Sequence, residues 1–256
     1  MENTTGLREN KKLRTRRQLA ATALELFLER GFDAVSVAEV AAAAEVSKPT
    51  LFRYFPSKED LLLDRFADHQ DEAARIVRDR PAGRTPAGAM RAHFLAALAE
   101  RDPITGLCDH PNVVAFQRLL YSTTSLQSRL RHYTDREVDL LAAVFEAEAL
   151  TPLAARLAAM HLVAVRRELG RENFRRIDSG QSADEAYPAA VADADQAFAM
   201  LADGLDRALP ISRAPALAPA SAQAPAPAPA PAPAQASAPA QAPAQASASA
   251  RASAAE

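Results

Sequence analysis

Apolar residues recur at spacings of three and four along most of the first 209 residues of this chain, which is the period of an amphipathic helix. Alternating apolar and polar runs bounded by turn residues, which are typical of strands, are hard to find. The pattern therefore predicts an all-α fold. Helices are expected at about 13–30, 37–44, 48–55, 58–80, 89–100, 112–121, 126–147, 152–176 and 184–209.

Capping residues mark the starts of the early helices. Ser36 and Glu39 have the spacing of a capping box, in which each side chain satisfies the other residue's backbone N–H. Ser57 and Asp60 repeat this spacing before a long apolar run, and Ser47 is a suitable N-cap between them. The result is two short helices, 37–44 and 48–55, separated by a tight turn.

Two short helices joined in this way have the layout of a helix-turn-helix. The second helix would bury Leu51 and Phe55, and a major groove is wide enough to admit its opposite face. Arg53 has the donors for a guanine edge, and Lys48 suits either a base or a phosphate. The residues available for DNA on this helix are Lys48, Pro49, Thr50, Phe52, Arg53 and Tyr54.

Positive charge is concentrated near the N-terminus. All four lysines lie in the first sixty residues, and residues 8–17 hold six positive charges and one negative charge. Because the net charge of the whole chain is only −2, contact with a polyanion is expected to be local, at one end of the molecule.

Composition also restricts the class of protein. A single cysteine, Cys108, excludes an internal disulfide framework and a four-cysteine zinc site. No apolar run is long enough to span a bilayer, and the N-terminus lacks the apolar core of a signal peptide. We therefore expect a soluble, cytoplasmic protein without a membrane partner.

Signals of an enzyme are missing from the sequence. It holds no phosphate-binding glycine loop, no dinucleotide fingerprint, no H-E-x-x-H and no G-x-S-x-G. The five histidines include no pair at the i, i+4 spacing of a helical metal site. Cys108, Asp109 and His110 are the only candidate for metal or redox chemistry, and the prolines on both sides of them indicate an ordinary turn instead. No catalytic residue, metal or cofactor is predicted.

The two ends of the chain have a different character from the helical part. Residues 1–12 are expected to form a flexible basic arm. Residues 210–256 are a low-complexity Ala/Pro-rich segment without aromatic residues, which predicts a disordered, partly polyproline-II tail. The tail is either inert or serves as a spacer or docking arm, and the sequence assigns it no mechanism.

The residues around the helix-turn-helix go beyond its general layout. The run FLERGF at 27–32 and the run SVAEVAAAAEVSKPTLFRYFPSKEDL at 36–61 closely resemble the DNA-binding domain of TetR/AcrR-family transcriptional regulators, over about residues 13–63. Two positions depart from the family pattern: Glu45 stands where glycine is frequent, and Phe52 where tyrosine is common. The resemblance places a DNA-binding domain at 13–60. It implies phosphate contacts by Ser36, Lys48, Thr50, Tyr54 and Lys58, and base contacts by Pro49 and Arg53.

The same resemblance implies that residues 61–209 form a helical ligand-binding and dimerisation domain. The segment 93–133 mixes aromatic and polar residues among aliphatic ones, as an apolar pocket with a few polar groups would. We expect a small, apolar or amphipathic effector, although each of these residues is also compatible with ordinary core packing. The predicted pocket residues are His93, Phe94, Phe116, Gln117, Tyr121 and Tyr133.

The last two predicted helices carry apolar seams that suit pairing with a second copy. Paired across a two-fold axis, they would form a four-helix interface, as in the family. The alternative is that these stripes cover the core of the monomer. The predicted interface residues are Leu157, Met160, Ala164, Val191, Phe198, Leu201 and Leu205.

Together these features predict a homodimeric repressor that binds a palindromic DNA operator and releases it when the effector enters the helical domain. A transcriptional activator or a ligand-independent DNA-binding protein of the same fold is the alternative. A helical ligand-binding or catalytic protein that has lost DNA binding is a further one, but Lys48, Thr50, Arg53 and Lys58 argue against it.

Overall fold

The chain was analysed as a computed structural model that describes residues 3–208, apart from the side chains of residues 3–9, 65, 67, 68 and 203–208. The predicted tail, 210–256, lies outside the described residues. Between residues 3 and 208 the chain is helical and contains no strand, which confirms the predicted all-α fold. The elements are α1 (Asn3–Arg30), α2 (Val37–Ala43), α3 (Lys48–Tyr54), α4 (Lys58–Asp68), α5 (Glu72–Arg78), α6 (Pro86–Ala99), the 3-10 helix η1 (Pro103–Thr105), α7 (Pro111–Ser122), α8 (Thr124–Ala147), α9 (Pro152–Asp178) and α10 (Ala183–Ala208).

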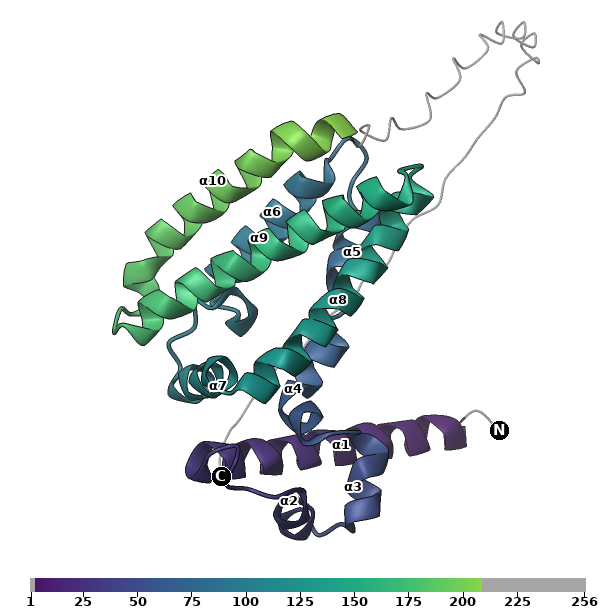
Figure 1. The fold of residues 1–256 in the computed structure, drawn as a ribbon, viewed down its shortest axis with the longest axis vertical. Helices are drawn as coiled ribbons and strands as arrows, with labels where there is room; N and C mark the ends of the chain where they lie inside the picture. Colours follow the sequence, from purple (N-terminus) through teal and green to yellow (C-terminus); the bar gives the residue numbers. More distant parts are fainter. Residues whose placement is uncertain (1–2, 209–256) are drawn as a thin grey trace, which may run out of the picture. The chain divides into compact units, whose positions relative to one another are not determined.

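The helices form two groups (Figure 1). Helices α1, α2 and α3 lie together at the lower end of the view, and α4 and α8 run upward from them. The second group packs α8 against α9, and α10 against both α6 and α9. None of the helices within residues 3–208 has both the length and the apolar character that crossing a membrane requires.

Two hydrophobic clusters correspond to these groups. The larger one lies among α5 to α10 and includes Met90, Phe94, Phe145 and Phe198. The smaller one is the core of the helix-turn-helix, but it also contains three leucines from the α7–α8 corner: Leu120, Leu126 and Leu130. The helix-turn-helix therefore shares its core with α7 and α8, which the sequence does not indicate.

The predicted helix at 58–80 is wrong as a single element. The structure ends α4 at Asp68 and begins α5 at Glu72, and the Glu72 amide donates to the carbonyl of His69 across the break. Leu61 and Leu63 before the break are buried in the helix-turn-helix core, whereas Val77 after it is buried in the larger cluster. One straight helix would have to bury its apolar side chains in two separate cores. The chain therefore breaks between the two cores, although the break contains neither glycine nor proline.

The first helix is longer than predicted. It begins at Asn3, so residues 3–12, expected as a flexible arm, form the first turns of α1. Good helix formers such as Leu7, Lys11 and Lys12 continue the helix, and no proline interrupts it. Gly31 ends α1 at φ +87°, and its amide donates to the carbonyl of Phe27 at 2.9 Å, as expected of a left-handed C-cap.

Candidate nucleic-acid interface

The turn between α2 and α3 is tight and contains a strained residue. Glu45 has φ +54°, and its amide donates to the carbonyl of Ala42, while the amide of Val46 donates to Ala41. A residue with a Cβ in this left-handed region costs about 1–2 kcal/mol relative to glycine. The glutamate at the position where glycine is frequent therefore adopts the conformation that glycine would, at a cost in stability.

Ser47 orients the start of α3. Its hydroxyl accepts the amide of Thr50 at 3.2 Å and lies 2.8 Å from the Thr50 hydroxyl, and Pro49 occupies the first turn, which has no N–H partner to lose. The N-terminal turn of α3 thus presents its remaining donors outward. This end of a helix favours phosphate oxygens.

The outer face of α3 carries the side chains predicted for DNA contact. Lys48, Pro49, Phe52 and Arg53 are exposed, Thr50 and Tyr54 are half-buried, and Leu51 and Phe55 are buried in the core as predicted. The ammonium of Lys48 lies 5.9 Å from the ring centre of Phe52, and the Arg53 guanidinium lies at the same distance from Tyr54. Each cation is therefore next to an apolar ring, a combination that suits the sugar–phosphate backbone and base edges of a groove.

Ser36 is held at the start of α2 by the predicted capping box. Its hydroxyl accepts the amide of Glu39, whose carboxylate accepts the amide of Ser36 at 2.7 Å and also pairs with Arg30 at 2.7 Å. The backbone hydrogen bond from Ser36, followed by the one from Arg30, lowers the pKa of Glu39 to about 2. The exposed Ser36 is thus fixed at a second helix N-terminus next to α3.

Lys58 has a different environment from the one expected of a phosphate contact. Its ammonium donates to the carbonyl of Phe32 and lies 4.3 Å from the Phe32 ring centre, and the side chain is half-buried. Lys58 therefore ties the start of α4 to the end of α1. A phosphate contact would require it to leave this carbonyl.

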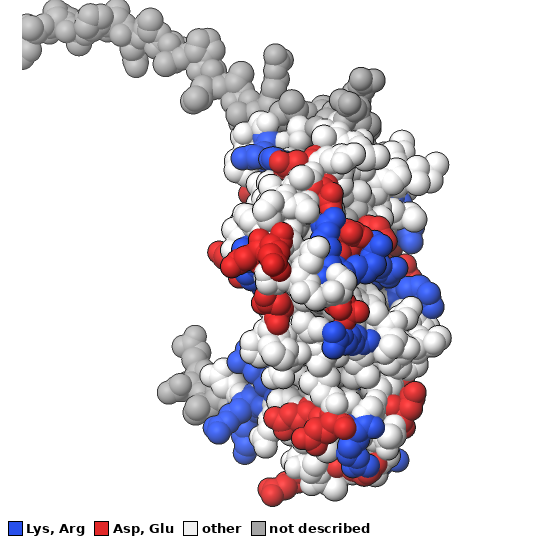
Figure 2. Space-filling view, turned by 90° about the vertical axis from the view of Figure 1, so that its left-hand side faces the viewer, with Lys and Arg blue, Asp and Glu red and all other residues white. Residues whose placement is uncertain are grey.

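Basic residues of α1 differ in availability. Arg16 pairs with Asp64 at 2.5 Å and lies over the ring of Phe55, whereas Arg14 and Arg17 are exposed. Figure 2 shows Lys and Arg side chains gathered at the lower left, at the end where α1, α2 and α3 lie, while acidic and basic side chains alternate over the upper part. The group at the lower left is thus one concentration of basic side chains on a face where basic and acidic side chains are otherwise mixed.

A buried carboxylate connects the helix-turn-helix to α8. Asp60, the capping-box residue of α4, is only 4% exposed. It accepts two hydrogen bonds from Arg129, at 2.7 and 3.0 Å, and one from the hydroxyl of Tyr133 at 2.7 Å. We call Asp60, Arg129 and Tyr133 the α4–α8 clamp.

The clamp has a strong effect on the protonation of its members. Burial raises the pKa of Asp60, but hydrogen bonds from Arg129, Tyr133 and Ser57 lower it more, so the net shift is downward. Burial, followed by the hydrogen bond to Asp60, raises the pKa of Tyr133 to about 12. Both shifts favour an ionised Asp60 beside a neutral Tyr133.

The predicted pocket residues lie in several different surroundings. Phe94 packs on Phe198 in the core, Phe116 stacks on Phe66, and Tyr133 belongs to the clamp. Two open surface hollows, of about 410 and 470 Å³, are lined by other residues, from α5 and α6 and from the α4–α8 junction respectively. Among the six predicted pocket residues, only Gln117 and Tyr121 lie one turn apart on a shared helix face, that of α7.

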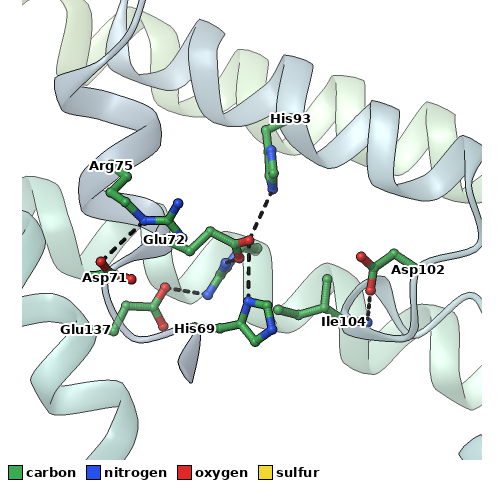
Figure 3. A network of polar contacts seen from close by, with 9 residues as sticks. His69, Asp71, Glu72, Arg75, His93, Asp102, Ile104 and Glu137 are labelled. Carbon is green, nitrogen blue, oxygen red and sulfur yellow. Dashed lines mark hydrogen bonds and ion pairs between the residues drawn. The ribbon is translucent and has the colours of Figure 1, made fainter. Parts of the chain in front are cut away.

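His93 belongs to a polar network between α5, α6, α8 and α9 (Figure 3). Glu72 lies at its centre, 3.8 Å from His93, 3.6 Å from His69 and 3.3 Å from Arg166. Arg166 also pairs with the buried Glu137, and burial raises the pKa of Glu137. The described residues include no group of three or more His, Cys, Asp or Glu side chains arranged to hold a metal ion.

The predicted dimer residues separate into two sets. Leu157, Met160 and Ala164 of α9 are exposed, whereas Phe198 of α10 is 2% exposed against Phe94, which makes its assignment to an intermolecular surface wrong. The apolar stripe of α10 faces the core of the monomer because α10 packs on α6 and α9. Val191 and Leu201 are half-buried against the same core, and the side chain of Leu205 lies outside the described residues.

Sequence reasoning missed the clamp and the shared core. Asp60 was recognised as a capping residue, but Arg129 and Tyr133 lie 69 and 73 positions away, and no local pattern connects them to it. The leucines of the α7–α8 corner have ordinary helical spacing, which shows that they are buried without showing in which core.

Several known proteins are similar to this chain. The sequence model of the family described as "Bacterial regulatory proteins, tetR family" matches residues 19–64. The chain is 34% identical over 170 residues to the HTH-type transcriptional regulator TcmR of Streptomyces glaucescens, covering 66% of this chain and 75% of that protein. It is 41% identical over 63 residues to the HTH-type transcriptional activator FasR of Mycolicibacterium smegmatis, covering 25% of this chain and 29% of FasR. Among solved structures, Salmonella enterica GusR is similar with a TM-score of 0.49 and 20% identity, over 76% of this chain and 96% of that one.

Proposed function

We propose that this chain, which belongs to the tetR family of bacterial regulatory proteins, represses transcription as a homodimer on a palindromic operator and releases the DNA when a small molecule binds its helical domain. As a member of that family it is a DNA-binding transcriptional regulator. The observation that carries the proposal is the exposed face of α3, which presents Lys48, Phe52 and Arg53 above a fully buried Leu51.

On DNA, α3 is expected to lie in the major groove. Arg53 would contact a base edge, because its exposed guanidinium has the two parallel donors that match guanine. Lys48, the N-terminal amides of α3 and Ser36 would contact phosphates and fix the register. Lys58 is not assigned a phosphate contact, because its ammonium donates a hydrogen bond to the carbonyl of Phe32.

Homodimerisation is supported by an unusual exposure of large apolar side chains on α9. Leu153 is 70% exposed, Leu157 45% and Met160 47%, and their spacing places them on one face of the helix. On α10, Met200 is 76% exposed. Contiguous apolar surface of this kind marks an interaction site, and pairing it across a two-fold axis would place two α3 helices on half-sites about 34 Å apart.

The activator alternative has one specific observation in its favour. FasR, which is named an activator, is 41% identical to this chain over 63 residues. Activation and repression differ in where the operator lies relative to the promoter, and a DNA-binding helix has the same chemistry in both. A reporter gene whose promoter carries the operator of this protein separates the two roles. Adding the protein lowers expression of the reporter if it is a repressor and raises expression if it is an activator.

The proposal is tested by selecting bound duplexes from a random DNA pool at moderate and at raised salt. A two-fold symmetric motif retained at raised salt is the expected result. Binding without a motif that disappears as salt rises would reject sequence-specific regulation, because phosphate attraction alone has that salt dependence.

A matched pair of variants sharpens this test. Arg53→Ala should relax base preference at one position of each half-site, at a cost of about 1–3 kcal/mol there. Arg136→Ala removes an exposed arginine on α8 and should leave the motif unchanged. If both variants recover the parental motif with the parental affinity, the base contact assigned to Arg53 is wrong.

A further inference from the structure

Arg167, in the middle of α9, is a half-buried arginine that forms no ion pair among the described residues, although Glu137 attracts it from a longer distance. Its guanidinium donates to the hydroxyl of Thr134 on α8, and within the described part of the chain no carboxylate lies at ion-pair distance from it. The preceding residue, Arg166, is by contrast paired with two glutamates. Burial lowers the pKa of Arg167, as expected of a cation withdrawn from water. Glu137 compensates this charge only from beyond ion-pair distance, so an anion in direct contact would stabilise the buried guanidinium further.

Tyr121 and a second cation, Arg171, lie close enough to Arg167 to act on its charge. Tyr121 of α7 is half-buried, and its ring centre lies 5.2 Å from that of Phe174. The guanidinium of Arg171, one turn after Arg167 on α9, lies 5.5 Å from the centre of the Tyr121 ring and is exposed. The surroundings of Arg167 therefore combine an apolar aromatic wall with an accessible positive rim.

An unsatisfied acceptor lies one turn from Tyr121. Gln117 is 8% exposed, and its amide nitrogen donates to the carbonyl of Pro103 at 3.1 Å. Its Oε1 is the one buried side-chain polar atom, among those that the structure describes, that has no hydrogen-bond partner. A buried acceptor left unpaired costs about 1–3 kcal/mol, so a ligand donor would find a partner there.

We infer that the effector of this regulator is an amphipathic anion, an aromatic or similarly flat molecule whose acidic group pairs with Arg167 and Arg171 beside Tyr121, and whose hydroxyl or amide donates to Gln117. This inference rests on the proposed function, because it specifies the ligand of the same helical domain. It narrows the apolar or amphipathic effector expected from the sequence to a negatively charged one.

The position of this site also explains how its occupancy reaches the DNA-binding unit. Thr134, which accepts from Arg167, directly follows Tyr133 of the α4–α8 clamp. On α7, Tyr121 directly follows Leu120, which is buried in the helix-turn-helix core. An anion that draws Arg167 away from Thr134 therefore acts on α7 and α8. On each helix it acts beside a residue that contacts the helix-turn-helix, Leu120 on α7 and Tyr133 on α8.

The test uses the full chain and pairs of small molecules that differ in charge. Salicylate is compared with salicylamide, and 6-hydroxy-2-naphthoate with its primary amide; each pair keeps the ring and the hydroxyl and removes the negative charge. Affinity is measured by calorimetry and by the shift of the melting temperature, and release of the selected operator by fluorescence anisotropy. At least one carboxylate is expected to bind at least tenfold more tightly than its amide and to release the operator.

Three variants separate the role of Arg167 from a general effect. Arg167→Gln should abolish the preference for the carboxylate, and Arg167→Lys should retain it in part because the charge remains. Arg175→Gln removes an exposed arginine two turns later on α9 and should leave the preference intact. Circular dichroism of each variant checks that it is folded.

The inference is overturned by equal binding of carboxylates and amides, by a carboxylate preference that survives Arg167→Gln, or by binding of neither carboxylate. These outcomes differ from failure of the proposed function. If a symmetric operator is found and the anions have no effect, the proposed effector class is wrong while sequence-specific DNA binding stands. If the anions bind but no operator is found, the anion site stands while sequence-specific DNA binding is wrong.

Discussion

Removing Arg129 should destabilise the protein through the α4–α8 clamp, and the size of the effect follows from its geometry. Arg129 donates two hydrogen bonds to Asp60, a carboxylate that is almost fully buried. Hydrogen bonds to charged groups contribute about 1.5–3 kcal/mol each when buried, but the arginine itself is one-third exposed, which reduces its contribution. For Arg129→Met, which keeps most of the aliphatic stem, we expect a loss of about 2 kcal/mol in the free energy of unfolding. For a domain of this size that corresponds to a melting temperature lower by about 4–8 °C.

The loss should depend on pH in a definite direction. The pKa of Asp60 is lowered in the folded protein, so the clamp contributes stability above the unfolded value of 3.8 and loses it as the pH falls through the folded pKa. Without Arg129, burial still raises the pKa of Asp60 while the largest cause that lowers it is lost, so this pKa rises and the variant is weakened most at neutral pH. The difference between the two proteins should therefore shrink as the pH approaches 4.

Thermal melts at one protein concentration, at neutral pH and near pH 4.5, measure this effect. Arg131→Met, which removes an exposed arginine two positions later on α8, is the control and should melt like the parent. A melting temperature of Arg129→Met equal to that of the control, or a loss of the same size at both pH values, would refute the reasoning.

Three further changes test other parts of the structure. Arg166→Met removes the ion-pair partner of the buried Glu137 and should cost about 3 kcal/mol at pH 7. Because burial already raises the pKa of Glu137 and the loss of Arg166 raises it further, this cost should become smaller in thermal melts as the pH falls, and a cost that does not change with pH would contradict the reasoning. Glu45→Gly should raise the free energy of unfolding by about 1 kcal/mol, because glycine adopts a positive φ without strain, whereas Glu45→Ala should not raise it. Chemical denaturation measures both variants, and equal stability of the two would show that the turn is unstrained. Leu157→Glu combined with Met160→Glu should convert the proposed dimer to a folded monomer in sedimentation velocity, and a dimer that both substitutions leave unchanged would place the interface elsewhere.

The local part of this structure was predictable from the sequence because its causes are local. Capping boxes at Ser36 and Ser57 and the N-cap at Ser47 use residues three positions apart, and all three are present. Helical periodicity also predicted that Leu51 and Phe55 are buried. Most helix bounds lie within a few residues of those expected, since they depend on the same short-range pattern.

The remaining features depend on contacts between distant segments, which periodicity does not encode. The break between α4 and α5 follows from the separation of two cores, and the burial of Phe198 follows from how α10 packs on α6. An amphipathic stripe has the same spacing whether it covers its own monomer or a partner. That ambiguity is why the sequence placed Phe198 in the dimer interface together with Leu157, although the structure exposes only the latter.

The shared core limits what an effector can do to the DNA-binding unit. Leu120, Leu126 and Leu130 are buried in that core, and each fully buried leucine contributes about 1.5–3 kcal/mol, in addition to the clamp. An effector typically couples to a distant site with only about 1–3 kcal/mol. Because undocking the unit from α7 and α8 would cost more than this, effector binding is expected to move the helix-turn-helix together with the α7–α8 corner. In the proposed dimer, a change of that size is still sufficient to displace one α3 helix from its half-site, since two recognition helices would have to fit the same DNA face at once.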